Sequence, residues 1–126
     1  MVHAIIRTDT AGRITHWDEG AEQLFGHLAV AAVGQPVDLI VPEHLRDAHW
    51  NGFRRAMERP EIKDMAADLP VLCADGVVRE FAGRLLALSD GLGTAVGALA
   101  VYTDDGSTGV RPFSGSAGSS GDPVDG

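Results

Sequence analysis

The longest helical pattern in the chain covers residues 43–59. A helix of this length needs other elements of the chain to cover its apolar face. Apolar and small residues recur there at intervals of three and four, which is the repeat of one helix face. Most of the other positions are charged or polar, so we expect this face to turn inward. The predicted inward face consists of Leu45, Ala48, His49, Gly52, Phe53 and Ala56.

The segments on either side of this helix have the composition of short strands. Strands are predicted at residues 4–8, 13–17, 66–73, 77–88 and 94–103, with shorter helices at 18–25 and 29–33. Asp18 is placed to cap the first helix and Gly26 to end it. Pro70 indicates an edge strand, because proline cannot donate a ladder hydrogen bond. Together these elements predict an α+β domain.

Strand alternation and turn chemistry give two further expectations. In the second strand, Ile14 and His16 should share one face, with Trp17 on the other. Asp75 and Gly76 lie between two β-rich runs, which is typical of a hairpin turn.

Composition excludes several classes of function. The formal net charge of −8 argues against nucleic-acid binding, which needs clustered basic residues. No apolar run is long enough for a membrane helix, and residues 1–6 lack the features of a signal peptide. The single Cys73 fits a reducing compartment, so we predict a cytoplasmic protein. Residues 1–104 form the predicted domain, and Gly/Ser-rich residues 105–126 are predicted to be a disordered tail.

Residues 8–26 carry a resemblance to a known family. They read T-D-T-A-G-R-I-T-H-W-D-E-G-A-E-Q-L-F-G, which resembles the opening "T-D-x-x-G-x-I-x-x-W-N-x-x-A-E-x-L-F-G" of PAS domains. The later blocks at residues 34–35, 39–42 and 75–76 follow in the family's order, so the resemblance covers residues 2–104. It implies a five-stranded antiparallel sheet with helices packed on one face around a ligand pocket. PAS domains serve as sensors and dimerisation modules.

Residues 42–53 are similar to one group within that family, the haem-binding PAS domains of the rhizobial oxygen-sensor kinase and the direct oxygen sensor phosphodiesterase. This resemblance implies that His49 is the proximal ligand of haem b. Met65 falls where the phosphodiesterase has a distal methionine ligand. Ala67 falls where both sensors have the arginine that stabilises bound oxygen, so oxygen specificity is not implied. The remaining predicted contacts with the cofactor are Leu45, Trp50, Gly52 and Phe53.

Two functional hypotheses follow. In the first, the chain is a free-standing sensor that binds haem b, detects O2, CO, NO or redox state, and signals through protein association. In the second, His49 is an ordinary core histidine, Met65 fills a gap, and the chain is a haem-free interaction module in signal transduction or transcription regulation. Both predict a homodimer or a partner kinase or regulator. We find no nucleophile–base pattern and no output segment in the sequence, so no enzyme activity is expected.

Overall fold

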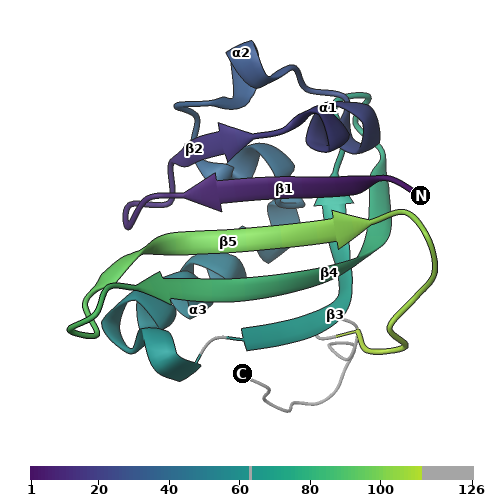
Figure 1. Cartoon of the computed structure of the whole chain (residues 1–126). Coiled ribbons are helices and arrows are strands. Elements are labelled where there is room, and N and C mark those ends of the chain that lie inside the picture. The colour runs from purple at the N-terminus through teal and green to yellow at the C-terminus, as the bar shows by residue number, and fades with distance from the viewer. Residues whose placement is uncertain (63, 112–126) are drawn as a thin grey trace.

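The fold is built on one antiparallel sheet, seen from its outer side in Figure 1. The computed structural model describes residues 1–62 and 64–111. Five strands lie in the order β2-β1-β5-β4-β3, which confirms the predicted sheet and its α+β class. Pro70 lies in β3 at one edge of the sheet, as the sequence predicted. The strands are β1 (His3–Thr8), β2 (Ile14–Trp17), β3 (Asp64–Leu72), β4 (Val78–Ser89) and β5 (Ala95–Thr103).

Strands β1 and β5 pair with each other at the centre of the sheet. His3 lies opposite Thr103, and Thr8 lies opposite Ala98. The Val2 amide donates a hydrogen bond to the Asp104 carboxylate at 3.1 Å. The chain therefore enters β1 and leaves β5 at the same end of the sheet (Figure 1).

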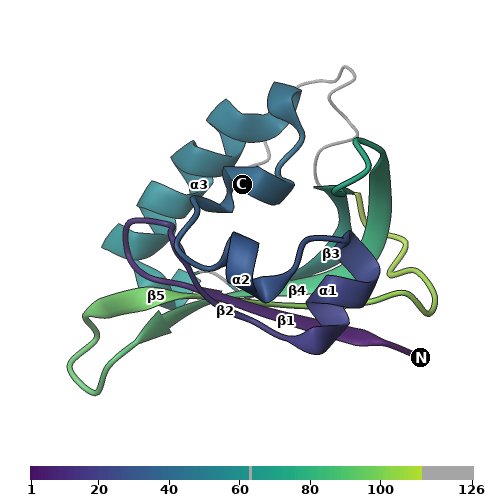
Figure 2. The same cartoon turned by 90° about the horizontal axis from the view of Figure 1, so that it is seen from above.

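All the helical segments lie on the inner side of the sheet, as Figure 2 shows. The Asp18 side chain accepts a hydrogen bond from the Ala21 amide at 2.8 Å, and Gly26 ends the first helix with φ 90°. Both end signals of that helix are therefore confirmed. The segments are α1 (Glu19–Phe25), α2 (Ala29–Ala32), η1 (Val37–Ile40), η2 (Glu43–Leu45), α3 (Arg46–Glu58) and η3 (Pro60–Ile62), the η segments being 3₁₀ turns.

Strand β2 presents a different face to the core than its alternation predicts. Ile14 and Trp17 are buried, whereas His16 is exposed, so the expected pairing of Ile14 with His16 is wrong. The cause is a bulge, since Ile14 lies opposite Thr8 while His16 lies opposite Arg7. The extra residue turns the Trp17 ring inward, where its indole N–H donates to a backbone carbonyl at 2.9 Å.

The core lies between α1 and the adjoining half of the sheet. Phe25 is its centre, with edge-to-face ring contacts at centroid distances of 5.9 Å to Trp17, 5.2 Å to Phe81 and 5.1 Å to Tyr102. Burial raises the pKa of the Tyr102 phenol well above its usual value. We call this part of the inner face the closed region; its buried members are Ala4, Ile6, Trp17, Ala21, Phe25, Leu69, Val71, Phe81 and Tyr102.

The C-terminal boundary differs from the prediction. The sequence assigned residues 105–126 to a disordered tail, but residues 105–111 lie against β3. Polar contacts hold this segment, and an apolar repeat could not have revealed them. We call residues 105–111 the strap; the rest of the predicted tail, residues 112–126, lies outside the described residues.

Candidate ligand site between helix α3 and the sheet

The inward face of α3 is turned slightly from its predicted position. His49, Trp50, Gly52 and Phe53 are half-buried, as expected of an inward face. Ala48 is exposed, so its assignment to this face is wrong. The large ring of Trp50 takes an inward position instead and rotates the helix away from Ala48. Leu45 ends η2 directly before α3 and is half-buried.

Trp50 fixes the position of α3 over the sheet. Its indole N–H donates to the Asp38 carboxylate at 2.6 Å, which ties α3 to η1. Its six-membered ring lies on Gly12, where an added Cβ would come within 2.3 Å of a ring carbon. Gly12 also has φ +82°, which side chains rarely adopt. Trp50, one of the predicted contacts with the cofactor, packs against the core.

His49 lies beside this anchor. Its imidazole is 5.1 Å from the Trp50 ring and 6.2 Å from the Phe53 ring, centroid to centroid. The imidazole and the Phe53 ring are nearly parallel, with 24° between their planes. The Nδ1 atom of His49 is buried. The sequence correctly expected His49 on the inward face of the helix.

Met65 and Ala67 lie on the inner face of β3, on the side of the sheet that α3 covers. The register of the sheet shows this. Ala67 pairs with Gly83, which pairs with buried Tyr102, so Ala67 points inward. Met65, two residues before Ala67, points to the same side and pairs with Leu85. Met65 is half-buried, and Ala67 is fully buried. The structure therefore places both residues on the same side of the sheet as His49. Ala67 brings no hydrogen-bond donor to this side.

Part of the inner face is covered incompletely. Five apolar residues that point inward by their register remain half-buried, whereas the closed region has lost almost all solvent contact. They lie toward the end of the sheet behind which α3 runs (Figures 1 and 2). Most of them are alanines, whose short side chains leave more space above the sheet than larger residues would. We call this surface the open region; it consists of Met65, Leu85, Ala87, Ala98 and Ala100.

The chemistry of these residues fits a haem. A haem iron needs only one or two axial ligands from the protein, and histidine and methionine both serve. His49 on the helix and Met65 on the sheet are residues of these two types, and the inward residues near Met65 on the sheet, Leu85, Ala87, Ala98 and Ala100, are apolar. Within residues 1–62 and 64–111, no three His, Cys, Asp or Glu side chains gather to hold a metal ion by themselves.

Sequence reasoning missed a charged side chain on the other side of β3. Asp68 is only 4% exposed, and its carboxylate accepts hydrogen bonds from Ser107 and Thr108 of the strap. The Ser107 hydroxyl and the Thr108 amide are the main causes that lower the pKa of Asp68 to about 2. The available signal was an aspartate in the middle of an apolar strand segment.

Comparison of the sequence with known proteins finds a relative but no family. No family model matches the chain. An uncharacterised protein of Azorhizobium caulinodans is 35% identical over 80 residues, which are 61% of this chain and 11% of that protein. This chain therefore spans about a tenth of the length of that relative.

Three solved structures are similar over most of the chain. A PAS domain of Colwellia psychrerythraea has a TM-score of 0.71 at 25% identity, covering 81% of this chain and 85% of that one. The PAS domain of the RpfR quorum-sensing receptor of Cronobacter turicensis, in complex with BDSF, has a TM-score of 0.66 at 16% identity over 84% of this chain and 96% of that one. The PAS-B domain of Drosophila melanogaster Cycle, with bound ethylene glycol, has a TM-score of 0.63 at 14% identity, covering 78% of this chain and 94% of that one.

These likenesses show the fold: the chain has the fold of PAS domains. Among the described residues, no helix has the length and apolar character needed to cross a membrane.

Proposed function

We propose that this chain is a PAS sensor domain that binds haem b between α3 and the sheet, with His49 as the proximal ligand. One observation carries the proposal: a half-buried histidine faces the side of the sheet where inward apolar residues are incompletely covered. Trp50 holds α3 in place through Asp38, so the imidazole stands on a rigid support. A rigid support is what an axial ligand requires.

Each neighbouring residue has a specific role in this proposal. The His49 imidazole would hold the iron from the helix side, and the Met65 thioether would approach it from β3. Leu85 and Ala100 would supply apolar walls. Haem supplies a redox-active iron that binds diatomic gases such as O2, CO or NO. Because Ala67 cannot donate a hydrogen bond to a bound gas, this side gives no preference for oxygen.

The signal would leave through protein association. Met65 would be the side chain that responds to a gas or to a change of iron oxidation state, because it lies on a strand of the sheet. Movement of that strand would shift the sheet between two arrangements. A second copy of the chain, or a partner kinase or regulator, would read this shift.

The absorption spectrum of the purified protein tests the proposal. Protein expressed with a haem supply should show a Soret band that survives gel filtration and shifts under CO. His49→Ala should lose the band, whereas His44→Ala, at an exposed position on η2, should keep it. Met65→Ala should lose six-coordinate low-spin character in the reduced state. Stoichiometric haem in His49→Ala would overturn the assignment of His49.

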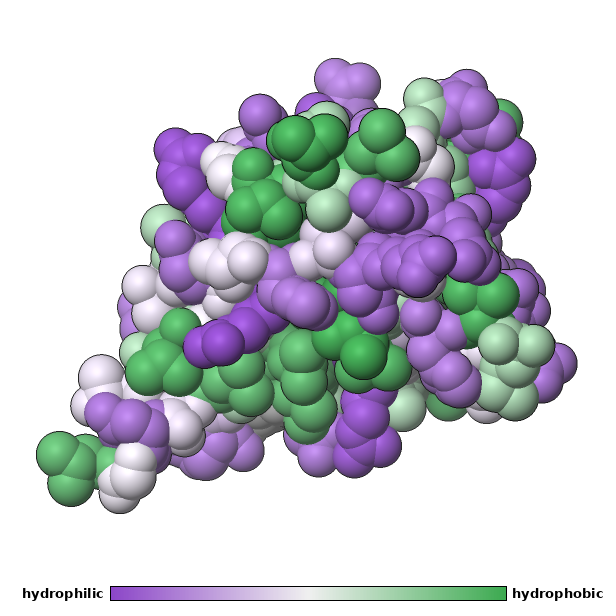
Figure 3. Space-filling view, turned by 45° about the horizontal axis from the view of Figure 1, so that its top comes forward, coloured by the Kyte–Doolittle hydropathy of each residue, from purple (hydrophilic) through white to green (hydrophobic). Residues whose placement is uncertain are grey.

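A second candidate function has its own supporting observation. Apolar side chains gather on the outer face of the sheet, in the lower half of Figure 3. By register, Ile5, Leu86, Leu99 and Val101 point outward there, and none of them is buried. Such a surface suits a haem-free module that associates with a second copy or another protein. Light scattering on the colourless protein, with Leu99→Glu as the variant, would show whether this face holds an assembly together.

A further inference from the structure

The strap runs along the free edge of β3. The Asp68 amide donates to the Val110 carbonyl at 2.7 Å, so one backbone hydrogen bond joins the strap to the strand. The Asp68 carboxylate accepts from the Thr108 amide at 2.7 Å and the Thr108 hydroxyl at 2.8 Å, and also from the Ser107 hydroxyl. One residue of β3 thus makes most of the contacts that hold the strap. Pairing also protects an edge strand from other chains.

The contacts of the strap are of a kind that can be released. A carboxylate is buried at low cost only while it is hydrogen-bonded, and water replaces those bonds when the strap lifts. Val110 is 52% exposed, so little apolar surface would be uncovered by release. A further contact is the ion pair between Arg111 and Glu80 at 3.0 Å, which is exposed and therefore weak. Asp68 is accordingly the main point of attachment.

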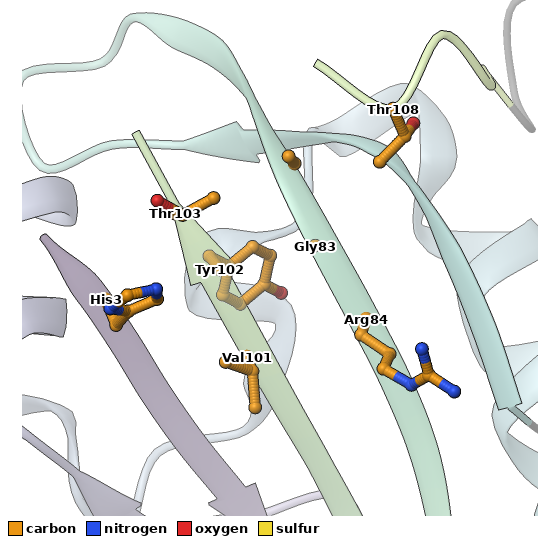
Figure 4. Close-up of a pocket in the computed structure, with 8 residues that line it drawn as sticks. His3, Gly83, Arg84, Val101, Tyr102, Thr103 and Thr108 are labelled. Atoms are coloured by element: carbon orange, nitrogen blue, oxygen red, sulfur yellow. The ribbon is translucent and has the colours of Figure 1, made fainter. Parts of the chain in front are cut away.

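The position of Asp68 links the strap to the opposite side of the sheet. It directly follows Ala67, and successive residues of a strand point to opposite faces. Met65 and Ala67 face α3, while Asp68 faces the strap. Figure 4 shows Thr108 of the strap at the margin of a shallow hollow of about 300 Å³ on the outer face, which Val101 and Arg84 also line. Release of the strap would change the shape of this hollow.

We propose that the strap is a releasable latch, held by Asp68, that opens when an occupant of the inner face displaces β3 at Met65 and Ala67. The displacement lengthens the bonds to Ser107 and Thr108 and frees residues 105–111 from the sheet. The coupling rests on the proposed function, in that it assumes a ligand against β3, but the latch itself does not. A change on the inner side of one strand would in this way alter the outer side, where partners can bind.

Hydrogen exchange at the Asp68 and Thr108 amides tests the latch without any ligand. Asp68→Ala should speed exchange at the Thr108 amide about tenfold, as expected when a charge-assisted hydrogen bond of a locally opening segment is lost. The double variant Ser107→Ala/Thr108→Val removes the two hydroxyl hydrogen bonds to the Asp68 carboxylate, keeps the bond from the Thr108 amide, and leaves β3 intact. Asp64→Ala is the matched control, because it breaks an exposed ion pair to Arg84 on the same strand. Unchanged exchange in both latch variants, or equal acceleration in the control, would overturn the latch.

A bulky side chain on the inner face tests the coupling without haem. Met65→Trp should speed exchange at the Thr108 amide about tenfold, the size of effect expected when the latch bonds are lost. Ala87→Trp adds the same bulk to the open region on β4 and should have a smaller effect. Equal exchange in Met65→Trp and the unmodified protein would overturn the coupling. If Met65→Trp opens the strap while the protein takes up no haem, the latch stands and only the haem assignment fails.

Discussion

The two regions of the inner face share strands β3, β4 and β5 but are packed differently. In the closed region, aromatic side chains from α1, β4 and β5 meet around Phe25, which is 1% exposed. In the open region, alanines on β4 and β5 face α3, and they remain half-buried. Gly83 marks the border, because a Cβ there would lie within 2.9 Å of the Tyr102 ring. Stability is thus concentrated in one half, and the other half keeps surface available for a ligand.

The largest effect should come from removing the central ring of the closed region. Phe25→Ala should lower the free energy of unfolding by about 3 to 5 kcal/mol, because the ring has neighbours on several sides. Phe53→Ala is the counterpart on α3, where the ring is half-buried, and it should cost less. Urea denaturation of the two variants measures the difference. Equal losses would show that both regions are packed alike.

Enlarging a small residue should also destabilise the closed region more than the open region. Ala4 is fully buried beside Tyr102, so Ala4→Leu should cost about 1 to 3 kcal/mol through overpacking. Ala100 lies in the open region, and Ala100→Leu should cost less than about 1 kcal/mol. Thermal unfolding of both variants is a sufficient measurement. A large loss for Ala100→Leu would mean that α3 already fills the space above it.

The smallest effect concerns the outer side of β3, which neither region covers. The folded state lowers the pKa of Asp68 from 3.8 to about 2, so its ionised form favours folding. This contribution is complete above the ordinary pKa and is lost as the pH falls toward 2. Asp68→Asn should therefore show a shallower loss of stability between pH 4 and pH 2, measured by urea denaturation. An unchanged slope in Asp68→Asn would contradict this role of the Asp68 carboxylate.

Local signals in the sequence were enough to predict the strands and helices, and the resemblance of residues 2–104 to PAS domains supplied their arrangement. Asp18 and Gly26 mark the ends of α1 through hydrogen bonds made within one turn. Pro70 marks an edge strand because proline has no backbone N–H to donate. The inward position of His49 also followed from helical spacing. Whether His49 binds a metal stays a prediction, because a helical repeat shows which way a side chain faces and not what it binds.

The features that were missed depend on partners far away in the sequence. Thr108 bonds to Asp68 across 40 positions, and both residues taken alone are typical of loops. The bulge that turns Trp17 inward depends on how β2 pairs with Arg7 and Thr8. Ala48 was misplaced because Trp50, a larger neighbour tied to Asp38, determines the rotation of α3.

The central pairing of β1 with β5 has a mechanical consequence. Since His3 lies opposite Thr103, a force that pulls those two residues apart would open the ladder one pair at a time instead of shearing it. Unzipping of this kind yields at low force, because each hydrogen-bonded pair bears the load alone. Tension applied beyond residue 111 would reach Asp68 before it reached β5. The strap would therefore detach from β3 before the pairing of β1 with β5 came under load.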